Sequence, residues 1–505
     1  MSGALVIGDG PLTLEAVASW ARSGGPVAVS PVAGQRLAAG RRVVERAIET
    51  GVPVYGVTTA LGGKAVHSLT AEERVTFDRL VIAGRSAGVG EPLPEEIARA
   101  ALLIRAAGMA NGGSGADPRV LDALVAALNA GLTPVVPTTG SVGAGDLVLM
   151  AHLTAPLVGA GEACIAGERM PGAAALDRAG LAPLDLGPKD GLTLCNSSAV
   201  SAAAGVFAVL DTATQLAALD RAAALSIEGF RGNPSPFDPR VQGDRPAPGQ
   251  TAAAGRIRRL LAGSALFEDG GPRRVQDPLS IRCLPQVHGA LLAALDFARS
   301  AVAAELTGGG DNPLVLPEDG AILSTGNFHT AALALSLDAL GLAVSQCANL
   351  AAERVKKLLQ GRLTGLADAL APDDGSSAGF APLMKTAQAL AAEIRHLAAP
   401  VCHEVIDVGN DVEDAGSNAL PAALKLRRMD RRLGYLVAIE LVVAAEAVDR
   451  RALDRIGSGA GETHRAVRDT VAPLTADRPL APDVERLAAV VADGGFSAPT
   501  NDGQA

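Results

Sequence analysis

A long run without proline constrains the fold of this chain more than any other feature of its sequence. Residues 197–230 read SSAVSAAAGVFAVLDTATQLAALDRAAALSIEGF, with no proline and little to interrupt a helix. At about 1.5 Å per residue, such a run forms a helix on the order of 45 Å long. Comparable runs rich in alanine and leucine occupy 286–306, 328–361, 381–400 and 419–455. Their polar residues are too sparse to cover a whole solvent-facing side, which is typical of helices inside a bundle or an oligomer.

The first part of the chain has a different texture. Glycine-rich loops at 53–65, 84–94 and 111–118 interrupt short elements, and a helical pattern occupies 95–110. We therefore predict a mainly α fold, in which a smaller mixed α/β N-terminal part precedes a long central helical bundle. The predicted divisions are 1–195 for the mixed part, 196–455 for the bundle, and 456–505 for a C-terminal helical segment and tail.

Composition excludes several classes of protein. Hydrophobic residues make up 48% and charged residues 19% of the chain, which is too apolar for a disordered protein. The net charge is −10 and the basic residues are scattered, so we expect no nucleic-acid partner. The N-terminus lacks the pattern of a secretory signal, and no uninterrupted apolar run reaches the roughly 18 residues of a membrane span. We expect a cytoplasmic protein without a membrane partner.

Polar loops between the predicted helices indicate a binding site for a small molecule. Asp-Asn-Pro, Arg-Cys and Asn-Phe-His sequences are not needed to pack a bundle, and loops on a rigid scaffold often form sites. The five cysteines are widely spaced, and an acidic run at 404–414 lacks the pattern of a calcium loop, so we expect no metal site. The polar loops span 273–289, 307–316, 324–330 and 408–419.

These motifs occur in an order that is specific to one family. YGVTT, AGVGEPL, VPTTGSVGAGDL, QDPLSIRC followed by PQVHGA, DNPL and GNFH follow one another between about residues 50 and 420. In this the chain resembles the histidine and aromatic amino-acid ammonia-lyases. The resemblance implies the ammonia-lyase/fumarase-like fold and a homotetramer in which several subunits contribute to each active site.

The glycine-rich loop departs from the pattern of that family. There an Ala-Ser-Gly tripeptide cyclises with loss of water and forms 4-methylideneimidazol-5-one, an electrophile that activates the amine of the substrate. Here the corresponding loop is Gly143, Ala144, Gly145 and Asp146, without a serine between alanine and glycine. We therefore expect that this group is not formed and that the enzyme uses no cofactor. Leu279 also replaces the usual tyrosine of the arginine loop.

The resemblance further implies roles for individual residues. Tyr55 corresponds to a tyrosine suited to proton transfer, and Arg282 is a fork that can bind a substrate carboxylate through two hydrogen bonds. Glu413 corresponds to a residue facing the ring of the substrate in the histidine-specific branch. Arg85 and Lys385 are candidates for holding an anionic ring substituent or the enolate-like carboxylate. The expected catalytic residues are thus Tyr55, Arg85, Lys385 and Glu413, and the expected substrate-binding residues are Asn196, Arg282, Gln286 and Phe328.

Three functions remain open from the sequence. The first is elimination of trimethylamine from a histidine-type betaine, as in ergothionase-like relatives, because a quaternary ammonium leaves as a neutral amine without activation. The second is the usual ammonia-lyase or aminomutase chemistry on an aromatic amino acid, with the electrophile formed by another route. The third is a repurposed scaffold, either cyclase-like or non-catalytic, which would fail to bind amino-acid-like carboxylates.

Overall fold

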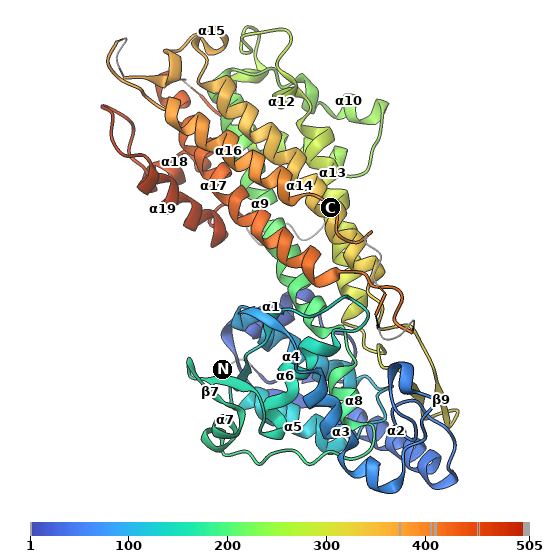
Figure 1. Cartoon of the computed structure of the whole chain (residues 1–505). Helices are drawn as coiled ribbons and strands as arrows, with labels where there is room; N and C mark the ends of the chain where they lie inside the picture. The colour runs from blue at the N-terminus through green and yellow to red at the C-terminus, as the bar shows by residue number, and fades with distance from the viewer. Residues whose placement is uncertain are drawn as a thin grey trace. The chain divides into compact units, whose positions relative to one another are not determined.

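The computed structural model describes residues 3–372, 375–403, 407–408, 412–451, 453 and 455–497. About 60% of the residues are helical and 7% are in strands, which confirms the mainly α fold. The chain divides into two compact units, and each is assembled from three separate segments. The first contains Met1–Phe207, Arg299–Leu337 and Pro400–Leu424, and the second contains Ala208–Ala298, Asp338–Ala399 and Lys425–Ala505. Four of the five chain boundaries between the units fall inside long helices, which Figure 1 draws as coiled ribbons, and the fifth falls between residues 399 and 400, outside any helix.

The first unit combines helices with four small sheets. In the first sheet, β1 (Leu5–Ile7) pairs with β2 (Val27–Val29) in parallel. The other three sheets are antiparallel: β3 (Val89–Pro92) pairs with β5 (Pro137–Thr139), and β8 (Leu314–Leu316) pairs with β9 (Ala321–Leu323). In the three-stranded sheet, β6 (Glu162–Ile165) lies between β4 (Thr133–Pro134) and β7 (Glu168–Pro171). The helices are α1 (Leu14–Ser23), α2 (Pro31–Thr50), α3 (Ala71–Arg85), α4 (Glu95–Ala110), α5 (Pro118–Asn129), α6 (Leu147–Thr154), α7 (Gly172–Ala179) and α8 (Asp190–Cys195).

Helix α4 forms the centre of this unit. Its bounds are those of the helical pattern at 95–110, and most of its residues are buried, including Leu102, Leu103 and Met109. It packs against α1 and α5. Helices α3, α6 and α8 form a second group of mutual contacts. A capping box between Thr70 and Glu73 stabilises the start of α3. Helix α8 ends directly before Asn196.

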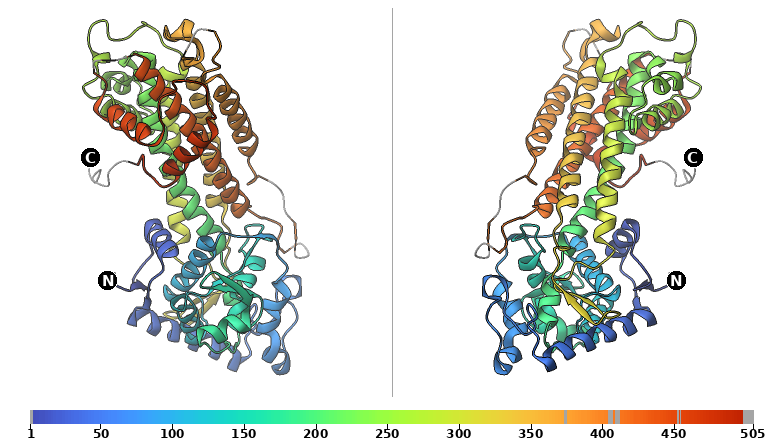
Figure 2. Two further views of the ribbon diagram at one scale, coloured as in Figure 1. Left: turned by 90° about the vertical axis from the view of Figure 1, so that its left-hand side faces the viewer. Right: turned by 90° about the vertical axis from the view of Figure 1, so that its right-hand side faces the viewer.

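The second unit is a bundle of long helices, which run side by side in the views of Figures 1 and 2. The predicted runs form α9 (Ala199–Phe230), α13 (Leu284–Glu305), α14 (Ala331–Leu358), α16 (Ala381–Leu397) and α17 (Ala419–Arg451). The first residues of α9, α14 and α17 and the last residues of α13 belong to the first unit. Inside the bundle, the buried Arg354 of α14 donates to both oxygens of Glu440 on α17, and Ser226 of α9 donates to the same carboxylate. Shorter helices complete the unit: α10 (Pro239–Asp244), α11 (Gln250–Leu260), α12 (Leu279–Arg282), α15 (Gly361–Thr364), α18 (Ser458–Thr470) and α19 (Ala481–Ala492).

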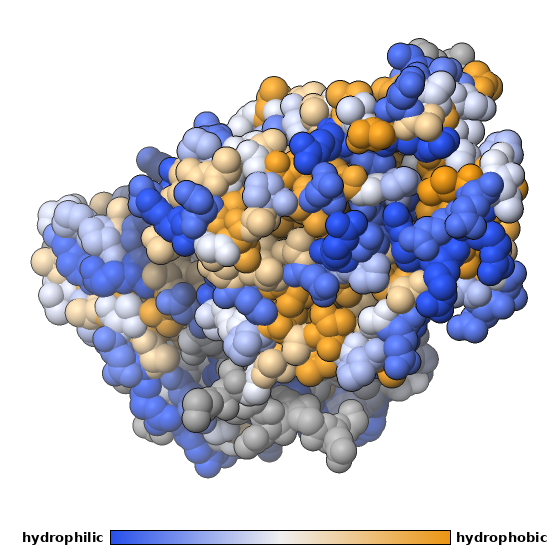
Figure 3. Space-filling model, turned by 90° about the horizontal axis from the view of Figure 1, so that it is seen from below, coloured by the Kyte–Doolittle hydropathy of each residue, from blue (hydrophilic) through white to orange (hydrophobic). Residues whose placement is uncertain are grey.

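Three helical segments are long and apolar enough to cross a bilayer, by length and composition alone. They are Asp190–Phe230, Leu284–Glu305 and Ala331–Leu358, and 94%, 39% and 67% of their most apolar windows are buried inside the structure. The sequence expectation considered only uninterrupted apolar runs, whereas these windows have a high mean hydropathy although they contain polar residues. Apolar surface also remains outside the core: Val66 is 94% exposed, and hydrophobic residues gather between charged ones on the face in Figure 3.

Candidate active site

Two glycines of the glycine-rich loop have backbone conformations that favour glycine, and one of them has no space for a side chain. Gly143 and Gly145 have φ angles of +78° and +71°, in the left-handed region. A Cβ atom on Gly143 would lie 2.1 Å from the hydroxyl of Ser417. The Gly143 carbonyl accepts hydrogen bonds from the hydroxyls of Thr330 and Ser417, at 3.2 and 3.0 Å. The loop is therefore attached to the two segments that precede α14 and α17.

Asp146 anchors the other end of the loop to α9. Its carboxylate is fully buried and accepts hydrogen bonds from the hydroxyls of Ser141 and Ser201, at 2.5 and 2.7 Å, and from the backbone N–H of Ser201 at 2.7 Å. Burial raises the pKa of Asp146, and these hydrogen bonds oppose that rise because they stabilise the charged form. Ser141 is thereby occupied in holding the loop.

A cavity of about 500 Å³ opens beside this loop within the first unit. Its walls come from the turn after Tyr55, the end of α3, the start of α6, the end of α8, and the loop that precedes α14. The structure thus brings together residues that are far apart in the sequence. Of the predicted site residues, Tyr55, Arg85, Ala144, Asn196, Phe328 and Glu413 line this cavity.

Tyr55 and Arg85 provide its candidate proton-transfer group and its positive charge. The hydroxyl oxygen of Tyr55 accepts a hydrogen bond of 2.9 Å from the N–H of Gly62. Such a donor stabilises negative charge on that oxygen. The guanidinium of Arg85 makes one weak hydrogen bond, of 3.4 Å, to the carbonyl of Val81 on its own helix. Its other N–H groups donate to none of the residues that the structure describes, and the carboxylate of Glu413 lines the same cavity.

Asn196 is held in place by a residue that the sequence analysis did not single out. Its side-chain amide donates a hydrogen bond of 2.8 Å to the carbonyl of Asn312, and the side-chain oxygen of Asn312 accepts the N–H of Thr325 at 3.0 Å. Asn312 and Thr325 both line the cavity. Asn312 therefore connects two of its walls. Its presence in the DNPL motif was the available signal.

A buried ion pair in turn positions Asn312. Arg105, in the middle of α4, donates to both oxygens of Asp311 at 2.8 and 3.2 Å, and also donates to the carbonyl of Thr193. Arg105 and Asp311 are only 3% and 1% exposed. A single arginine in the apolar run ALLIRAAGM is the sequence signal that could have revealed this pair, because an unpaired buried charge is very costly.

We expect Arg105→Met to destabilise the protein by about 3–5 kcal/mol, because it leaves the carboxylate of Asp311 buried without a partner. Chemical denaturation monitored by circular dichroism measures this change. Arg178→Met is the matched control, since Arg178 pairs with Glu168 on the surface, where an ion pair contributes about 1 kcal/mol or less. Equal, small effects of the two substitutions would contradict the positioning role of Arg105.

The structure places the remaining predicted residues in the second unit. Arg282 is the last residue of α12, Gln286 lies exposed in the first turns of α13, and Lys385 lies exposed on α16. The Nε atom of Arg282 is buried and has no hydrogen-bond partner among the described residues. None of these three residues lines the cavity beside Tyr55.

The acidic run at 404–414 lies partly outside the described residues, which omit 404–406 and 409–411. Within the described part of the chain, no group of three histidine, cysteine, aspartate or glutamate residues is arranged to hold a metal ion.

Comparisons with known proteins match almost the whole chain. The family model described as aromatic amino acid lyase matches residues 12–469. Histidine ammonia-lyase from Symbiobacterium thermophilum is 40% identical over 484 residues, which are 96% of each protein. Histidine ammonia-lyase from Anaeromyxobacter sp. (strain K) is 42% identical over 504 residues, 97% of this chain and 99% of the relative.

Solved structures share the fold over the same length. Ergothionase from Treponema denticola, an ergothioneine-degrading enzyme solved with desmethyl-ergothioneine sulfonic acid, superimposes with a TM-score of 0.93 at 28% identity, covering 98% of this chain and 100% of that one. Histidine ammonia-lyase from Trypanosoma cruzi gives a TM-score of 0.90 at 28% identity, covering 98% and 94%.

These comparisons contradict the expectation that the enzyme uses no cofactor. Histidine ammonia-lyases, at 40–42% identity, favour the methylideneimidazolone group of the family over its absence. The local residues nevertheless differ from those that form the group: Ala144 and Gly145 are adjacent, and the N–H of Gly145 donates to the carbonyl of Phe328 at 3.0 Å. Because this loop does not contain the serine of the usual tripeptide, the residues present there do not fit the formation of the group from Ala-Ser-Gly.

Proposed function

Because the chain belongs to the aromatic amino acid lyase family and is a carbon–nitrogen lyase, we propose that it eliminates trimethylamine from a histidine-type betaine. The observation that best supports this is the cavity in which Tyr55, Arg85 and Glu413 surround one space. It combines a candidate base, a positive charge and a carboxylate, which are the groups that this substrate class needs. The names of the relatives also support a histidine-derived substrate.

Tyr55 is the proposed base. Its deprotonated oxygen takes a proton from the β-carbon, while the N–H of Gly62 stabilises the charge on that oxygen before transfer. The electron pair of the broken C–H bond forms the double bond, and the pair of the Cα–N bond leaves with the amine. A quaternary ammonium becomes neutral trimethylamine in this step, so its departure needs no proton. The other product is an unsaturated carboxylate conjugated to the ring.

Glu413 and Arg85 bind the substrate at its ring end in this proposal. The carboxylate of Glu413 accepts a hydrogen bond from an imidazole N–H, and the guanidinium of Arg85 neutralises an anionic ring substituent or the enolate-like carboxylate that forms during proton removal. The side-chain amide of Asn196 donates one hydrogen bond to the carbonyl of Asn312, and its side-chain oxygen lies beside Gly145. Phe328 contributes an apolar wall against the ring.

We propose that Arg282, Gln286 and Lys385 complete the site from another subunit of a cytoplasmic homotetramer. Arg282 binds the substrate carboxylate, and Lys385 is available to an anionic ring substituent. The unpartnered Nε of Arg282 supports this role, because a buried guanidinium donor needs an acceptor. The apolar side chains of Val66 and Val412 at the Tyr55 cavity are 94% and 57% exposed, and covering them would remove apolar surface from water.

The names of the relatives favour a second candidate, elimination of ammonia from histidine itself. The purified enzyme, assayed with the trimethyl betaine of histidine, with histidine and with phenylalanine, separates the two through the released amine and the ultraviolet absorbance of the product. We expect kcat/KM for the betaine to exceed that for histidine by roughly tenfold or more.

Turnover of histidine without turnover of the betaine would contradict the proposed leaving group and establish the second candidate. If no compound is turned over or bound, both candidates are wrong. The intact mass of the same preparation reports independently whether the loop has lost the water that cyclisation would remove.

A further inference from the structure

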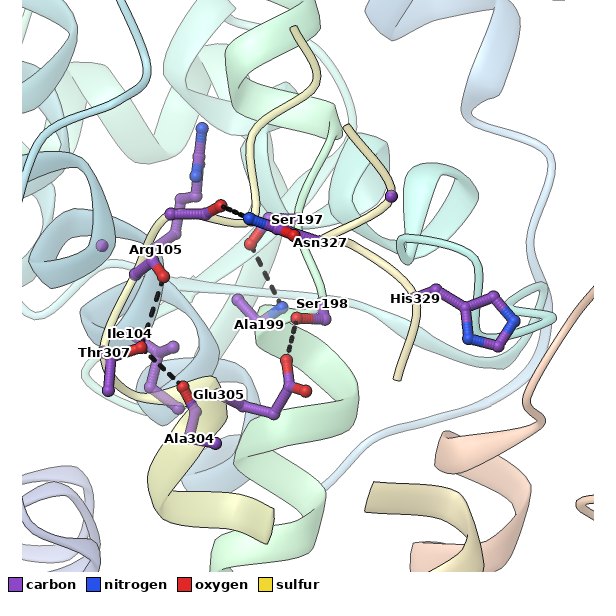
Figure 4. Close-up of a pocket in the computed structure, with 15 residues that line it drawn as sticks. Ile104, Arg105, Ser197, Ser198, Ala199, Ala304, Glu305, Thr307, Asn327 and His329 are labelled. Carbon is purple, nitrogen blue, oxygen red and sulfur yellow. Dashed lines mark hydrogen bonds between the residues drawn. The ribbon is translucent and has the colours of Figure 1, made fainter. Parts of the chain in front are cut away.

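A second cavity in the first unit adjoins the proposed active site but contains none of the residues assigned to the reaction. It has a volume of about 410 Å³ and is lined by the start of α9, the ends of α4 and α13, and the loops before β8 and α14 (Figure 4). Two chain segments are common to both cavities. Asn196 and Phe328 line the first cavity, whereas their neighbours Ser197, Asn327 and His329 line the second.

A run of three glycines gives this cavity a wall made of backbone. Gly308 and Gly309 have φ angles of +86° and +79°, and a Cβ atom on Gly308 would lie 3.1 Å from the carbonyl oxygen of Gly108. The carbonyl of Gly309 accepts a hydrogen bond of 3.2 Å from the amide of Asn327. Each such carbonyl has a second lone pair, so this wall offers acceptors and no competing side chains.

Glu305 supplies a negative charge that no described side chain neutralises. One of its oxygens accepts a hydrogen bond of 2.7 Å from the hydroxyl of Ser198, and Figure 4 shows these two side chains facing each other. No lysine or arginine forms an ion pair with Glu305 in the described part of the chain. Burial, together with the charge of Asp146, raises the pKa of Glu305. A cation in the cavity would favour its charged form.

The surrounding charges also favour a cation. Arg105 lines the cavity, but its guanidinium is bound to both oxygens of Asp311. Ala304 and Glu305 end α13 and Gly108 lies in the last turn of α4, so two helix C-termini, which carry partial negative charge, meet here. One helix N-terminus is present, that of α9, and the hydroxyl of Ser197 already accepts the N–H of Ala199.

We infer that this second cavity binds a small protonated amine. One N–H of the ammonium donates to the carboxylate of Glu305, which also pairs with the positive charge, and any further N–H groups, as in ammonium itself, donate to the carbonyls of the glycine run. The proposed elimination releases neutral trimethylamine, which takes up a proton from water and so becomes a cation of this class, and the site is a position at which this amine is held after elimination. That identity of the natural ligand rests on the proposed function, whereas the binding chemistry does not.

Saturation-transfer NMR on the methyl protons of trimethylammonium, at constant ionic strength, tests this with the full chain. Ammonium chloride serves as competitor and sodium chloride as the ionic control. We expect binding that ammonium displaces and sodium does not. Glu305→Gln should weaken binding roughly tenfold or more, because it replaces a charged acceptor by a neutral one and hydrogen bonds to charged groups are the stronger ones. Glu413→Gln, the same change in the first cavity, should leave this binding intact.

Absence of binding to the wild-type protein, or equal binding to Glu305→Gln, would overturn the inference, and loss of binding in Glu413→Gln would assign the amine to the first cavity instead. Circular dichroism establishes that each variant is folded. If Glu305→Gln does not fold, Thr307→Lys takes its place, since a lysine there supplies a competing ammonium and should also prevent binding. If amines bind through Glu305 but the betaine is not a substrate, only the proposed function fails.

Discussion

Tyr55→Phe is expected to lower kcat roughly 10²–10⁴-fold while KM changes little, because it removes the proposed base and leaves the shape of the cavity unchanged. The phenyl ring keeps the contacts of the tyrosine, and only the oxygen that accepts the N–H of Gly62 is lost. Steady-state kinetics with the preferred substrate measure the change, and a ligand-induced thermal shift shows whether the variant still binds it.

The chain contains a matched control for this substitution. It has only two tyrosines, and the second, Tyr435, donates a hydrogen bond of 2.9 Å to Glu485 within the second unit. Tyr435→Phe should therefore leave turnover close to that of the wild type. Near-normal turnover of Tyr55→Phe would show that another group removes the proton, and a parallel loss of binding would assign Tyr55 to substrate recognition.

Arg282→Met is expected to lower kcat/KM roughly 10²–10³-fold, mainly through KM, because it removes a charge-assisted bidentate contact to the substrate carboxylate. Arg282→Lys keeps the charge but not the planar fork, and should retain part of the affinity. Arg240→Met is the control, since Arg240 forms an exposed ion pair with Asp238 in the same unit. Unchanged kinetics of Arg282→Met would exclude this arginine from the site.

Combining the two variants tests whether subunits share the site. If Tyr55 and Arg282 of one site come from different chains, co-expression of Tyr55→Phe and Arg282→Met chains produces some sites that contain both native residues. Random assembly of a symmetric oligomer would give roughly a quarter of such sites. If one chain supplies both residues, no site is complete and activity stays at the level of the separate variants.

For the cofactor, the local pattern of one loop and the relatives of the whole chain give different answers. The missing serine between Ala144 and Gly145 predicts the absence of the group, and the relatives contradict that prediction. The pattern describes which residues are present in one loop. The chemistry of an enzyme also depends on the rest of the molecule. The Symbiobacterium relative is 40% identical to this chain over 96% of its length, and not in one loop alone.

The long helices were predictable because their cause is local. Residues 199–230 contain no proline and few polar side chains, so the backbone must satisfy its own hydrogen bonds and the surface must be covered by other helices. The pattern at 95–110 indicated α4 in the same way. The motif order likewise identified Tyr55, Arg85, Asn196, Phe328 and Glu413, which the structure gathers around one cavity.

Other features depend on pairs of residues that no local pattern connects. Arg105 and Asp311 are 206 residues apart, and Asn196 and Asn312 are 116 apart. Burial makes these pairs necessary, and burial is set by tertiary packing. By itself, the sequence determined the helices and the kinds of chemical group available to the site. Only the tertiary structure decided which groups share a cavity, that Arg282 belongs to the other unit, and that Glu305 has no positively charged partner among the residues that the structure describes.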